Sequence, residues 1–84
     1  MEESNEILGH VLMELANKFK FNLTKESNRW VLSNGNYKFI SFIYDGAIIV
    51  ELESKNLKIE NVIIGVYYNF TNLRKGLEND IKRN

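Results

Sequence analysis

Two dipeptides, Asn34-Gly35 and Asp45-Gly46, constrain the fold of this chain more than any other feature of its sequence. Asn, Asp and Gly accept the positive φ that both central residues of a type I′ turn require, and this turn joins two antiparallel strands through a two-residue loop. The residues around both dipeptides are rich in β-branched and aromatic side chains, as strands are. We therefore expect two tight hairpins that share one strand, residues 36–44.

The rest of the chain divides between helical and strand periodicity. Near its start, apolar residues recur three and four positions apart, which is typical of a helix with one apolar face, and over 19–24 they alternate with polar residues, as in a strand. Leu73, Leu77 and Ile81 again have helical spacing, with Thr71 as the expected cap. The predicted elements are a helix over 4–17, strands over 19–24, 29–33, 36–44, 47–53 and 58–67, and a helix over 71–82.

This order of elements predicts an α+β fold of two layers, with an N-terminal helix, a five-stranded antiparallel meander sheet and a short C-terminal helix. The 84 residues suit a single compact domain, 1–84. A chain of this size buries only about 60–65% of the surface that its unfolded form exposes. Gly65 is a candidate for a β-bulge in the last strand.

Loop lengths predict which side chains share a face of the sheet. Residues opposite each other across a hairpin point to the same side, so each loop fixes the register of its two strands. With a four-residue first loop, the predicted pairs are Leu23 with Trp30, Leu32 with Tyr37, and Ile43 with Ile48. One face then collects the core, which consists of Phe19, Phe21, Leu23, Trp30, Leu32, Tyr37, Phe39, Ile43, Ile48, Val50, Leu52 and Ile59.

The opposite face is also apolar at its centre. It collects Arg29, Val31, Lys38, Ile40, Phe42, Tyr44, Ala47, Ile49, Glu51, Glu53, Lys58 and Val62. In this register Lys38 lies across from Glu53, and Glu53 lies across from Lys58. Opposite charges at such positions stabilise a sheet.

Two short helices cannot comfortably cover both faces of five strands. We therefore expect an exposed apolar patch with a charged rim, which in a small protein marks a binding surface. The candidate partner-binding residues are Arg29, Val31, Lys38, Ile40, Phe42, Tyr44, Ile49 and Glu51. The alternative is that the C-terminal helix crosses to this face, or that the sheet curls around it, so that the patch is buried within the chain.

No motif in the chain points to an enzyme, a cofactor or a metal. The absence of Cys excludes disulfides, iron–sulfur clusters and a cysteine nucleophile, and the glycines form no phosphate-binding loop. His10 lies one helical turn from Glu6 and from Glu14, but three ligands on one exposed helix make a poor metal cage. Glu51 and Glu60 are expected to face each other on neighbouring strands, without the cleft that acid–base catalysis needs. We therefore expect no catalytic residue, no cofactor and no metal.

The balanced charge, eleven basic against eleven acidic residues, argues against a dedicated nucleic-acid partner, because phosphate neutralisation requires a basic excess. No apolar run approaches the roughly 20 residues of a membrane span. The acidic first six residues do not resemble a signal peptide, so we expect no membrane partner and a cytoplasmic location. The many Asn, Ile and Lys residues suggest an AT-rich source, such as a low-GC bacterium, a phage or a mobile element.

The sequence thus predicts a small non-enzymatic protein-interaction module that binds a protein partner through the second face of its sheet. Such a module is a homodimer, an inhibitor, an immunity protein or an adaptor. The alternative hypothesis is that aromatic side chains on the sheet bind single-stranded nucleic acid.

Overall fold

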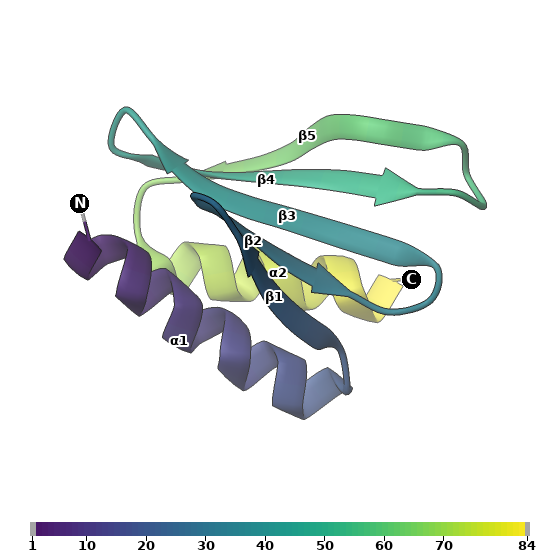
Figure 1. Ribbon diagram of the computed structural model, residues 1–84, viewed down its shortest axis with the longest axis horizontal. Coiled ribbons are helices and arrows are strands. Elements are labelled where there is room, and N and C mark those ends of the chain that lie inside the picture. Colours follow the sequence, from purple (N-terminus) through teal and green to yellow (C-terminus); the bar gives the residue numbers. More distant parts are fainter. Residues whose placement is uncertain (1, 84) are drawn as a thin grey trace.

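The computed structural model describes residues 2–83 and confirms the predicted α+β order of helix, five strands and helix (Figure 1). The elements are α1 (Glu2–Phe19), β1 (Asn22–Glu26), β2 (Arg29–Ser33), β3 (Tyr37–Tyr44), β4 (Ala47–Ser54), β5 (Ile59–Tyr67) and α2 (Phe70–Arg83). The strands form one antiparallel sheet in the order β1-β2-β3-β4-β5. The sheet is therefore a meander, with β1 and β5 at its edges.

Both helices lie against the same face of the sheet (Figure 1). Each helix has one apolar stripe, and both stripes enter a single core with the sheet. The helices contribute Leu8, Val11, Leu12, Leu15, Ala16, Leu73, Leu77 and Ile81, and the sheet contributes Leu32, Phe39, Ile48, Val50 and Leu52. The alternative that the C-terminal helix crosses to the second face is therefore wrong.

The two helices run side by side in the same direction. Arg74 Nη2 contacts Glu14 Oε1 at 2.8 Å and, one turn further along both helices, Lys18 Nζ contacts Glu78 Oε2 at 2.9 Å. The hydrogen bonds from Arg74 and Lys18 hold the pKa of each carboxyl group below its ordinary value. Because these ion pairs are exposed, most of the stabilisation of the helix pair comes from the apolar core beneath them.

Backbone geometry extends both helices beyond their predicted bounds. At the end of α1, Lys20 has a left-handed φ of 59°, and the N–H of Phe21 donates into the last turn of the helix at 2.9 Å, the bond of a Schellman cap. The first strand consequently begins at Asn22 rather than at residue 19. Before α2, the side-chain oxygen of Asn69 accepts a hydrogen bond of 2.8 Å from the N–H of residue 72. Asn69 is therefore the cap, and the prediction of Thr71 was wrong.

The Asp45-Gly46 hairpin has the predicted register, whereas the first two hairpins do not. Asp45 and Gly46 have φ values of 50° and 79°, as a type I′ turn requires, and Ile43 lies opposite Ile48. Across the first two loops, the observed pairs are Leu23 with Leu32 and Leu32 with Phe39.

Local hydrogen bonds and backbone angles explain the two wrong registers. Asn34 Oδ1 accepts the N–H groups of Asn36 and Tyr37, each at 2.8 Å, and this arrangement forms a longer loop in place of a type I′ turn. In the first loop, Ser27 has a φ of 60°, so two residues suffice to join Glu26 to Arg29. Both errors amount to two residues. Because side chains alternate with a period of two, the predicted faces of β1 to β4 are unchanged.

The last strand is irregular, and some of its predicted positions were wrong. Its register against β4 changes twice, and each change reflects an extra residue in β5. One change lies beside Gly65, where a bulge was expected: Val50 pairs with Gly65, and Glu51 pairs with Ile63. An extra residue reverses the direction of the side chains that follow it, so face assignments along β5 cannot be extrapolated from β4.

Trp30 closes the core side of the sheet against α1. Its indole N–H donates to Asn5 Oδ1 at 3.1 Å, and its ring lies against Gly9. A Cβ atom at Gly9 would come within 2.6 Å of the ring, so only glycine permits this close approach of helix and sheet.

Candidate protein-interaction surface

The sheet face that points away from α1 and α2, called the open face below, carries an apolar band across four strands. Its apolar residues are Val31 of β2, Ile40, Phe42 and Tyr44 of β3, Ala47 and Ile49 of β4, and Ile63 and Val66 of β5. Its charged residues on β1 to β4 are Glu26, Arg29, Lys38, Glu51 and Glu53. All eight residues predicted as partner-binding lie on this face.

The centre of the open face is sheltered only by neighbouring side chains of the sheet. Ile40, Phe42 and Ile49 are half-buried and keep contact with solvent, whereas Val31 and Ala47 are each 7% exposed. The sheet therefore does not curl far enough to close over its own apolar centre. The open face is neither a sealed core nor a polar surface.

Three large apolar side chains around this centre are strongly exposed. Tyr44, beside the turn between β3 and β4, is 70% exposed. Ile63 and Val66, on the edge strand β5, are 57% and 44% exposed. Side chains of this kind at the margin of an apolar band supply the area that a partner buries.

Ile63 and Val66 were not predicted as members of the open face, and Val62 was predicted in their place. In the structure, Ile63 lies opposite Glu51 and Val66 lies opposite Ile49, whereas Val62 pairs with the core residue Leu52. The irregular register of β5 causes the difference. Glycine at position 65 indicated a bulge, but a sequence does not fix how many side chains a bulge redirects.

Arg29 links three strands of the open face. From β2 its guanidinium reaches over the Phe42 ring of β3, with 4.3 Å between its central carbon and the ring centroid. Arg29 Nη1 also contacts Glu51 Oε1 of β4 at 3.3 Å. This arrangement combines a cation–π contact with an ion pair, and it shields one side of the aromatic ring.

The other predicted charge pairs have mixed outcomes. Lys38 lies opposite Glu53 as expected, with 3.7 Å between Nζ and Oε2. Lys58 precedes β5 with a φ of 55° and is not opposite Glu53, and Glu51 is not opposite Glu60. Both wrong pairs involve β5, whose extra residues change the register. Arg29 and Lys38 thus each form an ion pair with a carboxylate on the same face.

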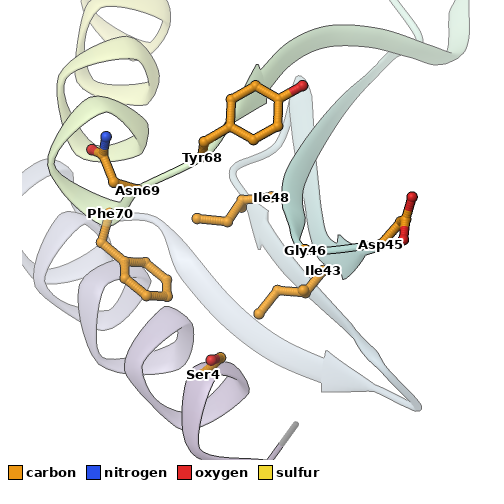
Figure 2. Close-up of a pocket in the computed structure, with 8 residues that line it drawn as sticks. All are labelled: Ser4, Ile43, Asp45, Gly46, Ile48, Tyr68, Asn69 and Phe70. Carbon is orange, nitrogen blue, oxygen red and sulfur yellow. The ribbon is translucent and has the colours of Figure 1, made fainter.

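A pocket of about 610 Å³ opens at one end of the molecule, where α1 begins, β3 turns into β4, and β5 leads into α2 (Figure 2). It is lined by Ser4, Ile43, Asp45, Gly46, Ile48, Tyr68, Asn69 and Phe70. Figure 2 shows the carboxylate of Asp45 and the hydroxyl of Tyr68 directed away from Ile48 and Phe70. Ile43, Ile48 and Phe70 supply the apolar part of its wall, and the side-chain oxygen of Asn69 is already bonded as the cap of α2.

The titratable groups of the described residues form no cluster suited to hold a metal ion. Within residues 2–83, no three His, Cys, Asp or Glu side chains are close enough together to hold a metal ion. Glu14, one of the three helix residues considered above, bonds Arg74 instead. Burial raises the pKa of Asp80, and burial together with the charge of Asp80 raises the pKa of Tyr67. Both groups lie on the helix side of the sheet, away from the open face.

Comparisons of this chain with models of protein families, with curated proteins and with solved structures give no match. No helix in the described part of the chain is long and apolar enough to cross a membrane.

Proposed function

We propose that this chain is a non-enzymatic protein-interaction module that acts in the cytoplasm and binds a protein partner through the open face. The observation that supports this proposal is the uncovered apolar centre of the open face. Both helices pack on the other side of the sheet, and no element within residues 2–83 covers this centre. Small proteins rarely leave a contiguous apolar surface in water unless a partner covers it. The chain's small size adds to this argument, because internal burial alone stabilises it modestly.

The composition of the open face also resembles that of protein interfaces. Aromatic and branched side chains occupy its centre and margin, and four of its charged side chains form two ion pairs, Arg29 with Glu51 and Lys38 with Glu53. Arg and aromatic residues dominate the binding energy of many interfaces. Phe42 with Arg29 above it is such a combination, and we assign this pair the central role in partner binding.

Single-stranded nucleic acid is the weaker candidate. The aromatic residues Phe42 and Tyr44 could stack bases, but phosphate binding requires unpaired positive charge along the groove. Arg29 and Lys38 are both within 4 Å of carboxylates on the same face. We expect no salt-sensitive binding when a labelled single strand is titrated with the protein at two salt concentrations.

The variant Phe42→Glu distinguishes a docking surface from an internal core. Phe42 is half-buried on the open face, where Arg29 can pair with the new carboxylate, whereas Phe39 is fully buried beneath the helices. We expect F42E to lose less than about 2 kcal/mol in the free energy of unfolding and the matched variant F39E to lose the fold. Circular dichroism with denaturant titration measures both. If F42E unfolds like F39E, the open face is core and the proposal fails.

A photo-crosslinking side chain at position 63 tests partner binding directly. Ile63 is 57% exposed on the open face, and Met13, the matched control, is 48% exposed on α1. We expect the probe at position 63 to form a discrete covalent adduct with a protein in expressing cells, and the adduct to disappear when Phe42→Glu is added. An equal adduct from position 13, or none from position 63, would contradict the proposal.

A further inference from the structure

We infer that the partner of the open face is a second copy of this chain, packed face to face about a two-fold axis that runs parallel to the strands between β3 and β4. This inference rests on the proposed function and adds the identity of the partner and the register of the contact. The two sheets lie about 10 Å apart with their strands nearly aligned, and the helices of both copies remain outside.

The distribution of apolar residues across the sheet places the axis. Open-face positions on β2, β3, β4 and β5 all include apolar side chains. On β1 the corresponding residues, Asn22, Thr24 and Glu26, are polar and exposed. The apolar band is therefore centred between β3 and β4, and β1 is left outside it. Two copies related by a two-fold axis at that centre overlap over four strands each, and β1 of each copy stays exposed to water.

Side chains on β3 and β4 match each other about this axis. This axis places β3 of one copy over β4 of the other. Each β3 residue of one copy therefore faces, on the second copy, the β4 residue that it pairs with inside its own sheet. Tyr44, which is 70% exposed, meets Ala47 of the other copy, whose small side chain leaves room for the ring. Lys38 meets Glu53 in the same way, so opposite charges face each other across the contact. The surface is therefore self-complementary in both shape and charge, as a two-fold interface requires.

Charge also selects the direction of the axis. A two-fold axis perpendicular to the strands at their centre would place β4 over β4 in the opposite direction, so that Glu51 meets Ile49 and Glu53 meets Ala47 of the second copy. Burying a carboxylate against an apolar side chain, away from any cation, is unfavourable. The axis parallel to the strands instead places Glu53 over Lys38 of β3 in the second copy, and so avoids this cost for Glu53.

The area of the apolar band is close to that of a standard interface. Four strands about 4.8 Å apart, with residues rising about 3.3 Å each over eight positions, project roughly 500 Å² per copy. Protruding side chains such as Tyr44 enlarge the surface actually buried. The result approaches the roughly 800 Å² that each partner contributes to a standard interface.

A charge exchange between two variants tests this geometry. In Lys38→Glu, both positions of the pair carry negative charge, and in Glu53→Lys both carry positive charge. Each variant alone then places like charges opposite each other twice in the dimer, whereas a mixture of the two restores opposite charges across the contact. We expect the wild-type chain to form a dimer. The dimer Kd of each variant alone should be raised roughly 10-fold, and the mixture of the two variants should regain wild-type affinity. Light scattering and sedimentation measure these masses and affinities.

The helix pair Lys18 and Glu78 provides the matched control, because this ion pair lies on the opposite side of the molecule. We expect Lys18→Glu and Glu78→Lys to dimerise like the wild type. A wild-type chain that is monomeric up to about 1 mM would overturn the inference. So would a dimer that Lys38→Glu and Glu53→Lys leave unchanged, or variants that do not complement each other. If the chain is monomeric but the probe at position 63 captures a different protein, the second copy is excluded while the proposed function stands.

Discussion

Two serines, Ser41 and Ser54, are buried on the helix side of the sheet, and their hydroxyl groups differ in what they bond. Ser54 Oγ accepts the N–H of Leu57 at 3.3 Å and so fixes the turn that follows β4. The side-chain oxygen of Ser41, which is 0% exposed, has no hydrogen-bond partner within residues 2–83. Burying a hydroxyl without a partner costs roughly 1–3 kcal/mol. Ser41 therefore weakens the core that it occupies.

We expect Ser41→Ala to raise the free energy of unfolding by roughly 0.5–1 kcal/mol, because the substitution removes a buried polar group without breaking a bond. Ser54→Ala should lower it by about 1 kcal/mol, since the N–H of Leu57 loses its acceptor. Denaturant titration of the two variants beside the wild type measures both changes. A clear loss of stability in S41A would show that its hydroxyl is bonded in solution.

Single residues of the open face were predictable where alternation is regular. Arg29, Ile40 and Ile49 lie where a period of two places them, because β2, β3 and β4 have no extra residue. Ile63 and Val66 were not predictable, because the register of β5 changes by one residue at two places. Gly9 was not recognisable as a contact for Trp30, because close packing between a helix and a sheet leaves no periodic pattern in a sequence.

At the level of the elements, similar dipeptides formed different turns. Asp45-Gly46 forms the expected tight turn because both residues adopt a positive φ. Asn34-Gly35 lies instead in a loop that the Asn34 side chain closes through two backbone N–H groups. Sequence reasoning predicted each strand near its observed position, and the register errors of two residues kept the faces correct. Asn or Asp before Gly can adopt the positive φ of a type I′ turn, or its side chain can accept backbone N–H groups and close a longer loop. Which of the two forms depends on the lengths of the flanking strands, which local sequence does not fix.

Alanine at the two glycines tests this difference between the turns. Gly46 has a φ of 79°, which strains any residue with a Cβ atom, so Gly46→Ala should lower the free energy of unfolding by about 1–2 kcal/mol. Gly35 has no positive φ and open space around it, so Gly35→Ala should change stability by less than about 0.5 kcal/mol. Equal losses in thermal or denaturant unfolding would mean that both dipeptides form type I′ turns.

The ion pairs between α1 and α2 should make stability depend on pH in acid. The bond from Lys18 lowers the pKa of Glu78 in the folded state below the value of about 4.3 expected in an unfolded chain. Its stabilising effect is therefore fully present above pH 4.3 and is lost as the pH falls through the folded pKa. We expect the Tm of Glu78→Gln to lie below that of the wild type at pH 6 and to converge with it near pH 3. A difference that persists at pH 3 would contradict this assignment.

For the whole molecule, the decisive feature is that two helices cover one side of a sheet that is apolar on both sides. The sequence indicated both apolar faces and a shortage of cover. It could not decide where the C-terminal helix would pack, because Leu73, Leu77 and Ile81 fit either face equally well. The structure places all three in the core with α1. The described elements thus leave the open face uncovered, and an apolar interface has the same alternating pattern in a sequence as a core.

Lysine at two neighbouring positions of β4 tests most directly whether the open face is a surface. Ile48 is 4% exposed and faces the helices, whereas Ile49 is half-buried on the open face opposite Val66. We predict that Ile48→Lys loses more than about 4 kcal/mol in the free energy of unfolding, or fails to fold, and that Ile49→Lys folds with a loss below about 2 kcal/mol. Equal losses in the two variants would mean that both sides of the sheet are core, and the open face would not be a docking surface.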